Sequence, residues 1–410
     1  MRALAAMAAA TCLLGTAAAA SSSPPCRHPC STHMLDSIVA RKQGIRDSGA
    51  ASSTLESGIL ALAIQDVVAL YPRSRSKYAG YLTQVLDVAS SKGLTNTAYA
   101  ATRPLDRFSL ATAIQSAVHS GVAHVTAQSL EARDAIGASL AVQKRNPDGG
   151  LWYYVYPEWS YLDGIFSLLP YMAAQDEVNY QDMLLQIKLL REHCTRHRTR
   201  ADTLLLVHGY DWSRKAVWAD TTTGASPHVW GRSLGWFIAG LVQTWERLSC
   251  SSVQGGQKVQ LCGLIRKTTF QISAALVEHA DPETGAWWQL VTFPGRSGNY
   301  LESSSTALFI FSILKALRIG LIYGDVPNYK DTAIKAYKYT VRHFVTSTED
   351  QTIGFDKTVS VCSLNSTATY EYYTKQPLSP NSLLGESAFI LASLEVERAR
   401  SSSLTCREGR

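Results

Sequence analysis

Charged residues are scarce in this sequence of 410 residues. Asp, Glu, Lys and Arg make up 18% of the chain, whereas 46% of the residues are hydrophobic. This balance excludes an intrinsically disordered chain, because disorder requires few apolar side chains and many charges. Beyond the first twenty residues, no run approaches the ~20 uninterrupted apolar residues that a membrane helix needs. We therefore expect a mature protein with a large buried core and no membrane segment.

Several catalytic motifs are also missing. The sequence contains no Walker loop, no Rossmann glycine fingerprint and no HExxH pattern, which disfavours nucleoside triphosphatases, dehydrogenases and zinc proteases. Closely spaced cysteines with a matching histidine or cysteine pair are absent as well, so no metal site is expected. Length alone leaves the number of domains open, since some closed barrels exceed 200 residues as one unit.

The positive charge is mild and dispersed. The formal net charge is +6, but the 39 Lys and Arg residues are scattered along the chain. The longest basic stretch runs from Arg191 to Arg200 and contains a glutamate, which favours a solvated helix end or loop over a nucleic-acid patch. We expect no nucleic-acid partner, and acidic small molecules or polysaccharides remain attractive partners.

The N-terminus has the features of a secretion signal. Residues 1–20 combine Arg2, a short apolar stretch and small residues ending at Ala20, a pattern typical of a cleaved signal peptide. A Ser-, Pro- and Cys-rich tether is expected at residues 21–34, a single catalytic domain at 35–400 and a tail at 401–410. The sequence thus predicts a secreted, extracellular protein, which we expect to be a monomer.

Export changes the interpretation of the cysteines. Cys12 would leave with the signal peptide, and seven cysteines would remain in an oxidising compartment. Proximity favours a bridge between Cys250 and Cys262, whereas Cys26 and Cys30 could bridge each other or join the termini through Cys406. Asn365 begins an Asn-Ser-Thr sequon, which predicts a glycosylated surface loop in an exported eukaryotic chain.

Helical periodicity dominates the body of the chain, and no sustained alternating strand occurs. Six nearly all-apolar helices recur, each opened by a small or acidic residue. They are marked by Glu56, Asp106, Asp163, Gly235, Glu302 and Glu386. These markers lie 50 to 84 residues apart, enough for an inner helix, a loop, an outer helix and a return. All-round apolar helices belong inside and amphipathic ones outside, so the sequence predicts an all-α, (α/α)6 barrel whose inner helices start at one rim.

Two aspartates open adjacent inner helices. Asp163 in WSYLDGIF lies at the mouth of an apolar helix, and Asp106 in RPLDRFSL holds the equivalent place one repeat earlier. Two carboxylates facing each other across the rim could perform the general acid and base catalysis that cleavage of a sugar bond requires. The alternatives are helix caps for both residues, or an ion pair of Asp106 with Arg103 or Arg107.

A third group of candidate residues could bind a sugar. Arg232 lies between two tryptophans on a glycine-interrupted turn, a good holder for a planar carboxylate with aromatic faces beside it. All nine tryptophans lie between Trp152 and Trp288, and tryptophans on rim loops favour a sugar platform. The candidate substrate-binding residues are His208, Trp230, Arg232, Trp236, Tyr153 and Trp152. Packed core side chains are the alternative.

At these residues the sequence resembles the unsaturated rhamnogalacturonyl hydrolases of glycoside hydrolase family 105, and more distantly the unsaturated glucuronyl hydrolases of family 88. The similarity runs from about Glu56 to Leu394. It rests on GGLWYY, YLDGIFSLLPYMA, WADTTTGASPHVWGRSLGW, GRSGNYLESSSTALF and YEYYTKQPLSPNSLLGESAFILA. The resemblance implies the same barrel and no cofactor, with Asp163 as the principal acid and base and Asp106 as the second catalytic carboxylate.

The resemblance also implies a sugar subsite and a substrate. His208, Trp230, Arg232 and Trp236 match family positions that line the subsite, whereas Tyr153 stands where the family commonly has a histidine. The expected function is removal of a terminal 4,5-unsaturated galacturonic acid from pectin-lyase oligosaccharides by hydration of its vinyl ether. The alternatives are an unsaturated glucuronyl hydrolase acting on other lyase-cleaved polysaccharides, and a secreted sugar-binding protein that has lost catalysis.

Overall fold

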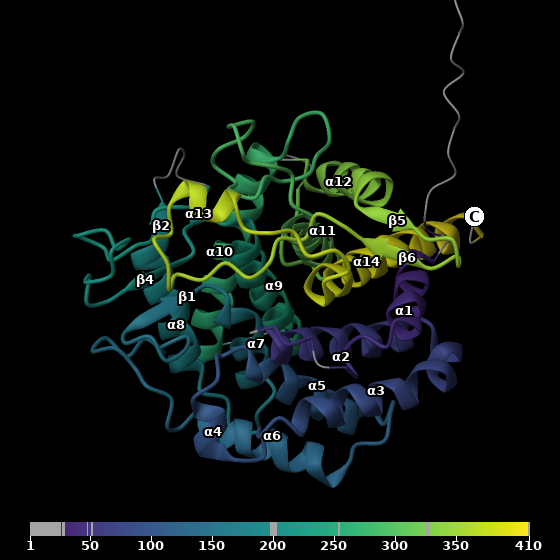
Figure 1. The fold of residues 1–410 in the computed structure, drawn as a ribbon, viewed down its shortest axis with the longest axis horizontal. Helices are drawn as coiled ribbons and strands as arrows, with labels where there is room; N and C mark the ends of the chain where they lie inside the picture. Colours follow the sequence, from purple (N-terminus) through teal and green to yellow (C-terminus); the bar gives the residue numbers. More distant parts are fainter. Residues whose placement is uncertain are drawn as a thin grey trace, which may run out of the picture.

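Six helices form a closed inner ring in the computed structural model. The model describes residues 26, 29–46, 48–50, 52–196, 203–252, 255–324 and 328–408, with side chains as far as Arg400. The inner helices are α2 (Ser53–Leu70), α5 (Arg107–Ser120), α7 (Gly164–Met172), α9 (Gly231–Arg247), α11 (Ser303–Arg318) and α14 (Leu383–Glu408). Each packs against the next, and α14 packs against α2. The ring is therefore complete (Figure 1).

A second set of helices surrounds this ring. It comprises α1 (Cys30–Ala40), α3 (Arg75–Ser90), α6 (Ala127–Ser139), α8 (Tyr180–Cys194), α10 (Gly256–His279) and α12 (Tyr329–His343). In Figure 1 these helices lie outside the inner ring, and each contacts at least one neighbour along the barrel wall. The alternation of inner and outer helices confirms the predicted (α/α)6 barrel, with α1 as the sixth outer helix.

The composition of the inner helices explains their position. Every described residue of α7 is buried, and so are the first fourteen residues of α11. A helix that is apolar on all sides is stable only where protein surrounds it. Helix α2 is an example. By length and composition it could span a membrane, but 67% of it is buried inside the barrel, as expected of a core helix.

Short strands and loops cover the rim at which the inner helices begin. β1 (Trp159–Tyr161) pairs antiparallel with β4 (Gly209–Asp211), and β5 (Val345–Ser347) pairs with β6 (Ile353–Phe355). A third pair joins β2 (Thr195–Arg196) to β3 (Leu205–Leu206). From β6 an irregular stretch, residues 356–369, crosses the barrel mouth to the short helix α13 (Tyr370–Thr374), as the yellow-green chain in Figure 1 shows. We call residues 356–369 the mouth segment.

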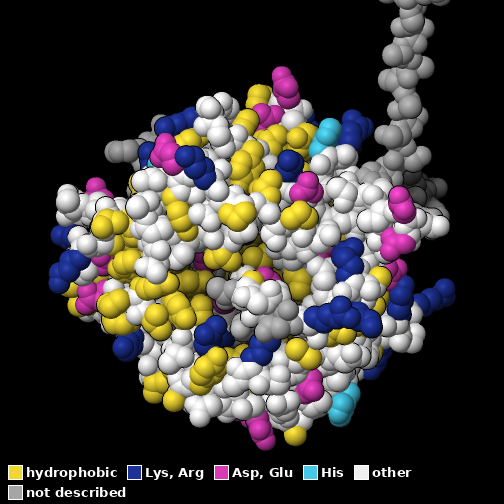
Figure 2. Space-filling model, viewed as in Figure 1, with side chains coloured by type: hydrophobic (Ala, Val, Ile, Leu, Met, Phe, Trp, Pro, Cys, Tyr) yellow, Lys and Arg dark blue, Asp and Glu magenta, His cyan; other side chains and the backbone are white. Residues whose placement is uncertain are grey.

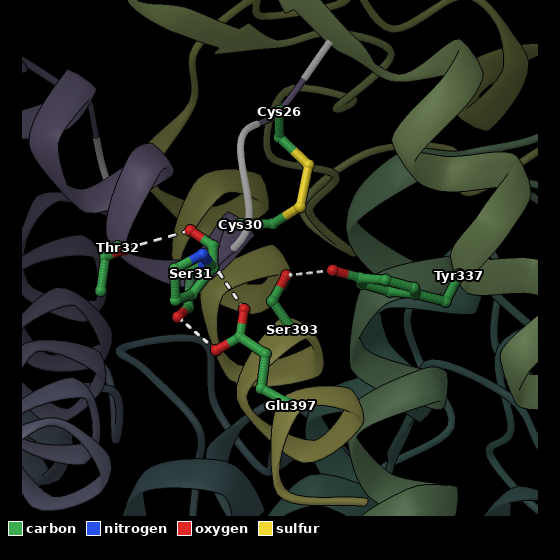
Figure 3. Close-up of a disulfide and its surroundings, with 8 residues drawn as sticks. Cys26, Cys30, Ser31, Thr32, Tyr337, Ser393 and Glu397 are labelled. Carbon is green, nitrogen blue, oxygen red and sulfur yellow. Dashed lines mark hydrogen bonds between the residues drawn. A yellow bond between two sulfur atoms is a disulfide. The ribbon is translucent and has the colours of Figure 1, made fainter. Parts of the chain in front are cut away.

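The N-terminal end of the described chain is tied to the last inner helix. Ser31 donates from both its backbone nitrogen and its hydroxyl to Glu397 of α14, at 3.1 and 2.6 Å, next to the disulfide between Cys26 and Cys30 (Figure 3). Of the two pairings left open for these cysteines, the structure has the local one. Helix α1 begins at Cys30, so the last five residues of the expected tether are helical.

The remaining described cysteines are one bridge and two thiols. The expected disulfide between Cys250 and Cys262 is present, and Cys194 and Cys362 are buried thiols. The expected signal peptide at residues 1–20, including Cys12, lies outside the described residues, as does the side chain of Cys406 in the expected tail. Asn365 is exposed on the mouth segment, where the sequon stays a prediction.

Replacing Cys250 and Cys262 together by Ala is expected to lower the free energy of unfolding by about 3 kcal/mol, because the bridge restricts a short loop in the unfolded chain. Urea unfolding of the wild-type and double-variant proteins measures the difference. As a control, reductant should lower the stability of the wild type much more than that of the double variant. Equal stability of the two oxidised proteins would contradict the prediction.

Candidate active site

Asp106 and Asp163 occupy equivalent places on adjacent inner helices. Asp106 immediately precedes α5 and Asp163 immediately precedes α7, yet neither side chain caps its own helix. Arg107 donates to Ser139, Gln143 and two backbone carbonyls instead of pairing with Asp106. Neither aspartate is therefore a helix cap, and among the described residues no ion pair joins Asp106 to Arg103 or Arg107. Both side chains line one pocket.

The pocket lies at the barrel rim beneath the mouth segment. Its volume is about 60 Å³, room for about two water molecules. It is lined by Ser52, Leu55, Asp106, Tyr153, Tyr161, Asp163, Trp230, Arg232, Trp236, Val361, Cys362, Ser363 and Leu384. A larger cavity of about 520 Å³ opens on the outer wall beside α1, away from the two aspartates.

Burial dominates the chemistry of Asp106. Its side chain accepts a hydrogen bond of 2.8 Å from the Tyr153 hydroxyl through Oδ2, whereas the buried Oδ1 has no partner within the described ranges of the chain. Desolvation raises the pKa of Asp106 to about 7; the hydrogen bond from Tyr153 opposes this shift and the nearby charge of Asp163 adds to it. Asp106 is thus a carboxyl group that retains a proton close to neutral pH. The role of Asp163 as the principal acid and base, which the resemblance implied, stays a prediction.

Asp163 receives its contacts on one oxygen. The Ser233 hydroxyl donates to Oδ2, and the Nε2 atom of His208 lies 3.3 Å from the same oxygen, without the alignment of a hydrogen bond. The other ring nitrogen of His208, Nδ1, is 2.8 Å from the Tyr373 hydroxyl. Within the described residues Oδ1 of Asp163 makes no hydrogen bond, so this oxygen is free to act in the pocket.

Aromatic rings and one arginine complete the wall. Trp230 and Trp236 are buried, and Trp230 packs against His208 with ring centroids 4.7 Å apart. Arg232 lies 4.8 Å from the Trp230 ring and donates to the carbonyls of Val359 and Ser360. The guanidinium group therefore holds the mouth segment over the pocket that it lines.

Two of the expected sugar-binding residues, Trp152 and His208, do not line the pocket. Trp152 does not line the pocket, and its ring packs beside Lys144 at 5.0 Å. Tyr153, the next residue, does line it, and its ring stacks on Tyr161 at 4.4 Å. His208 contacts Asp163 from outside the lining. The structure thus gathers Asp106, Asp163, Tyr153, Trp230, Arg232 and Trp236 around one space, and their roles stay predictions.

Three neighbours of Asp163 were not recognised in the sequence. Ser233 belongs to GRSLG, which satisfies a G-x-S-x-G pattern, but it lies inside α9 and not at the strand-to-helix turn of a nucleophilic serine. Its hydroxyl donates to Asp163. Tyr161 comes from β1 and Tyr373 from α13, and neither short element has a periodic pattern that could have revealed it.

Glu302 provides a structural counterpart to these aspartates. It also precedes an inner helix, α11, but its carboxylate accepts from the Ser305 backbone nitrogen and from the Val359 nitrogen of the mouth segment. Glu302 is therefore both a helix cap and an anchor for the mouth segment.

In the part of the chain that the structure describes, no group of three His, Cys, Asp or Glu side chains could hold a metal ion.

Tyr153→Phe is expected to move the alkaline limb of the pH profile of kcat/KM upward by roughly one unit, because the lost hydrogen bond stabilised the ionised form of Asp106. With the pKa of Asp106 above its present value of about 7, the acid would stay protonated to higher pH. Steady-state rates between pH 5 and pH 9 test this. Tyr154→Phe is the matched control. If the alkaline limb of Tyr153→Phe stayed in place or moved to lower pH, Asp106 would not be the acid that sets this limb.

Most of the chain matches a known protein family. The model of Glycosyl Hydrolase Family 88 matches residues 58–400. Two curated relatives, one from Agrobacterium fabrum and the 24.9 kDa protein in picA locus of Rhizobium radiobacter, are each 34% identical over 121 residues. That match is 30% of this chain and 48% of each relative. The chain thus spans about half the length of the curated relatives it matches.

Solved structures share the fold. A glycoside hydrolase of family 105 from C. acetobutylicum aligns with a TM-score of 0.76 and 24% identity, over 90% of this chain and 99% of its own. The unsaturated glucuronyl hydrolase responsible for the degradation of glycosaminoglycan from Bacillus sp. GL1 aligns with a TM-score of 0.61 and 12% identity, over 90% and 95%. Because the family model covers most of the chain, the protein belongs to Glycosyl Hydrolase Family 88, with the barrel fold that families 88 and 105 share.

Proposed function

We propose that this protein is a secreted hydrolase that removes the terminal 4,5-unsaturated galacturonic acid from oligosaccharides produced by pectin lyases. One observation carries the proposal: two carboxyl groups from adjacent inner helices line a single buried pocket together with an arginine and aromatic rings. The extended motif similarity to family 105 supports the galacturonyl substrate, and the apolar N-terminal stretch supports secretion.

The substrate has a reactive double bond beside its ring oxygen. Protonation at C4 of this vinyl ether places a positive charge on C5 and the ring oxygen, and water then adds at C5 with loss of a proton. The resulting hemiketal opens and releases the neighbouring sugar. The steps consume one proton and return one, so an acid and a base suffice.

The two aspartates differ in a way that suits these steps. Asp106 keeps a proton up to about pH 7 because it is buried, which makes it the proposed acid. Asp163 accepts from Ser233 through Oδ2, and its Oδ1 has no hydrogen-bond partner among the residues that the structure describes. This arrangement suits a carboxylate that activates water and stabilises the cation. Arg232 lines the same pocket, and its charge would attract the substrate carboxylate.

Glucuronyl substrates are the second candidate, because the matching family model is that of family 88. A solved structural relative, described as an unsaturated glucuronyl hydrolase, also shares the fold. Galacturonic and glucuronic acid become alike once the 4,5-double bond removes the stereocentre at C4. Discrimination between the two substrate classes must therefore come from the sugar on the leaving side.

Loss of ultraviolet absorbance from the conjugated double bond tests the proposal directly. The purified protein is incubated with unsaturated rhamnogalacturonyl, galacturonyl and glucuronyl disaccharides in parallel, and product masses are recorded. We expect turnover of the rhamnogalacturonyl compound. Faster turnover of glucuronyl substrates would select the second candidate, and binding without turnover of any compound would reject hydrolase activity.

A further inference from the structure

Tyr373 contacts the site through a histidine. The tyrosine lies in α13 and is fully buried, and its hydroxyl is 2.8 Å from Nδ1 of His208. The opposite ring nitrogen, Nε2, is 3.3 Å from Oδ2 of Asp163. Tyr373, His208 and Asp163 thus form a continuous row, in which the imidazole ring separates a phenol from a carboxyl group.

Hydrogen-bond satisfaction selects the tautomer of this imidazole. Among the described residues, the Tyr373 hydroxyl contacts no acceptor other than His208. If Nδ1 carried the hydrogen, it would donate to the phenol oxygen, and the phenol hydrogen would be a buried donor without an acceptor. If Tyr373 donates to a bare Nδ1, the phenol and Nδ1 are both satisfied, and the hydrogen lies on Nε2, which is 3.3 Å from Oδ2 of Asp163.

The surroundings of the two rings also favour donation from the Tyr373 hydroxyl to Nδ1 of His208. Burial places the pKa of Tyr373 well above its usual value of 10, so the phenol always has a hydrogen to donate. The His208 ring is wedged between Trp230, at 4.7 Å, and Tyr161, at 5.1 Å between centroids. These ring contacts hold the imidazole in place, with Nε2 facing Oδ2 of Asp163 at 3.3 Å.

We propose that Tyr373 is a positioning residue that fixes His208 as its Nε2–H tautomer and so directs a second hydrogen-bond donor, beside Ser233, onto Oδ2 of Asp163. The two donors hold this oxygen and leave Oδ1 as the oxygen that acts in the pocket. The kinetic consequence rests on the proposed function, whereas the tautomer does not. His208 then acts by orienting Asp163, and not by binding sugar as its family position implied.

Nitrogen-15 spectra of the full-length wild-type protein test the tautomer. The His208 signals are assigned by their disappearance in His208→Gln. We expect a bare Nδ1 and a protonated Nε2 at pH 7, and a displaced Nδ1 signal in Tyr373→Phe, which lacks the hydrogen bond. A protonated Nδ1 in the wild type, or an Nδ1 signal unmoved by Tyr373→Phe, would overturn the proposal.

Kinetics separate positioning from sugar binding. Tyr373→Phe is expected to lower kcat about tenfold, the effect of one buried hydrogen bond, with KM within twofold of the wild type. Tyr370→Phe is the matched control, because Tyr370 lies in the same helix and donates its hydroxyl to the Ser297 carbonyl. An unchanged kcat, or a raised KM at constant kcat, would overturn the proposal.

A second pair of variants covers the case in which Tyr373→Phe does not fold. In His208→Gln the amide reaches the place of Nε2, and in His208→Asn it reaches the place of Nδ1. The glutamine variant is expected to retain at least tenfold more kcat than the asparagine variant, and the reverse order would contradict the proposal. If the wild type turns over no uronyl substrate, the proposed function fails while the nitrogen-15 result still decides the tautomer.

Discussion

Asp163→Asn is expected to lower kcat/KM for the unsaturated substrate by roughly 10²- to 10⁴-fold, the range for loss of a general acid or base. Asn has nearly the shape of Asp, so the hydrogen bond from Ser233 to the side-chain oxygen can persist. What disappears is the negative charge and the ability to accept a proton from water. Loss of absorbance measures turnover, and calorimetry with the disaccharide measures binding, which we expect to change little.

An exposed aspartate near the same helix provides the control for this variant. Asp176 lies in the exposed turn that follows α7, so Asp176→Asn changes the same net charge without touching the pocket. It should retain full activity. If Asp163→Asn kept more than about one tenth of the wild-type rate, the acid and base role of Asp163 would be rejected. A large loss in both variants would point to net charge as the cause.

Asp106→Asn is expected to lower activity at least 10²-fold and at the same time to stabilise the protein at alkaline pH. Burial raises the folded-state pKa of Asp106 from 3.8 to about 7, so ionisation opposes folding. Stability of the wild type therefore falls as the pH rises from about 4 to about 7, and the deficit remains above pH 7. Asn mimics the protonated group and avoids this cost, which amounts to up to about 4 kcal/mol.

Denaturant unfolding at two pH values measures this gain. At pH 8 the variant should unfold at higher urea concentration than the wild type, and at pH 4 the two midpoints should nearly coincide. Absorbance assays on the same preparations should give a loss of 10²-fold or more. Greater stability of the wild type at pH 8 would show that burial does not raise the pKa of Asp106, independently of the result of the activity assay.

The barrel was predictable because its signal is repeated six times along the sequence. Helices that are apolar on every side recur at intervals that fit one inner and one outer helix, and all six inner helices lie close to their sequence markers. The outer position of α1 was missed. Its eleven residues follow a Pro- and Cys-rich stretch, and a single helix without a repeat partner in front of it resembles a tether.

The carboxylates of the site were predictable and their partners were not. Asp106 and Asp163 stand out because an acid before an apolar helix is conspicuous in the sequence. The contacts of Asp163 with Ser233 and His208 join chain positions far apart, and the contact of His208 with Tyr373 spans 165 residues. These contacts between distant residues depend on how the loops pack over the rim of the barrel. No local pattern encodes them.

The same limit explains the misplaced tryptophan. Trp152 and Tyr153 are neighbours on one loop, but Trp152 packs beside Lys144 and Tyr153 stacks on Tyr161. Sequence similarity placed both at the sugar, but only Tyr153 lines the pocket. The proposal that Asp106 is the acid likewise depends on burial. Among the described residues Oδ1 of Asp106 has no hydrogen-bond partner, whereas Asp163 accepts from the Ser233 hydroxyl.

The surface around the pocket is asymmetric. Figure 2 shows apolar side chains gathered at the left of this face, in the region of β1 and β4, and Lys and Arg side chains toward the lower right, in the region of α1, α2 and α3. An acidic oligosaccharide would meet the cations by electrostatic attraction on the one side and apolar side chains on the other.

The bond between Ser31 and Glu397 has a consequence for how the chain acquires its structure. These residues are separated by 366 positions, and α1 packs mainly against α14 and only slightly against α2. Most of the contacts of the sixth outer helix with the inner ring therefore form only when the last helix is available. During synthesis, five helical hairpins can assemble in order from the N-terminal side while α1 waits. Closure of the ring is then a late event of very high contact order, and partly synthesised chains would expose the apolar flanks of α2 and α11 to aggregation.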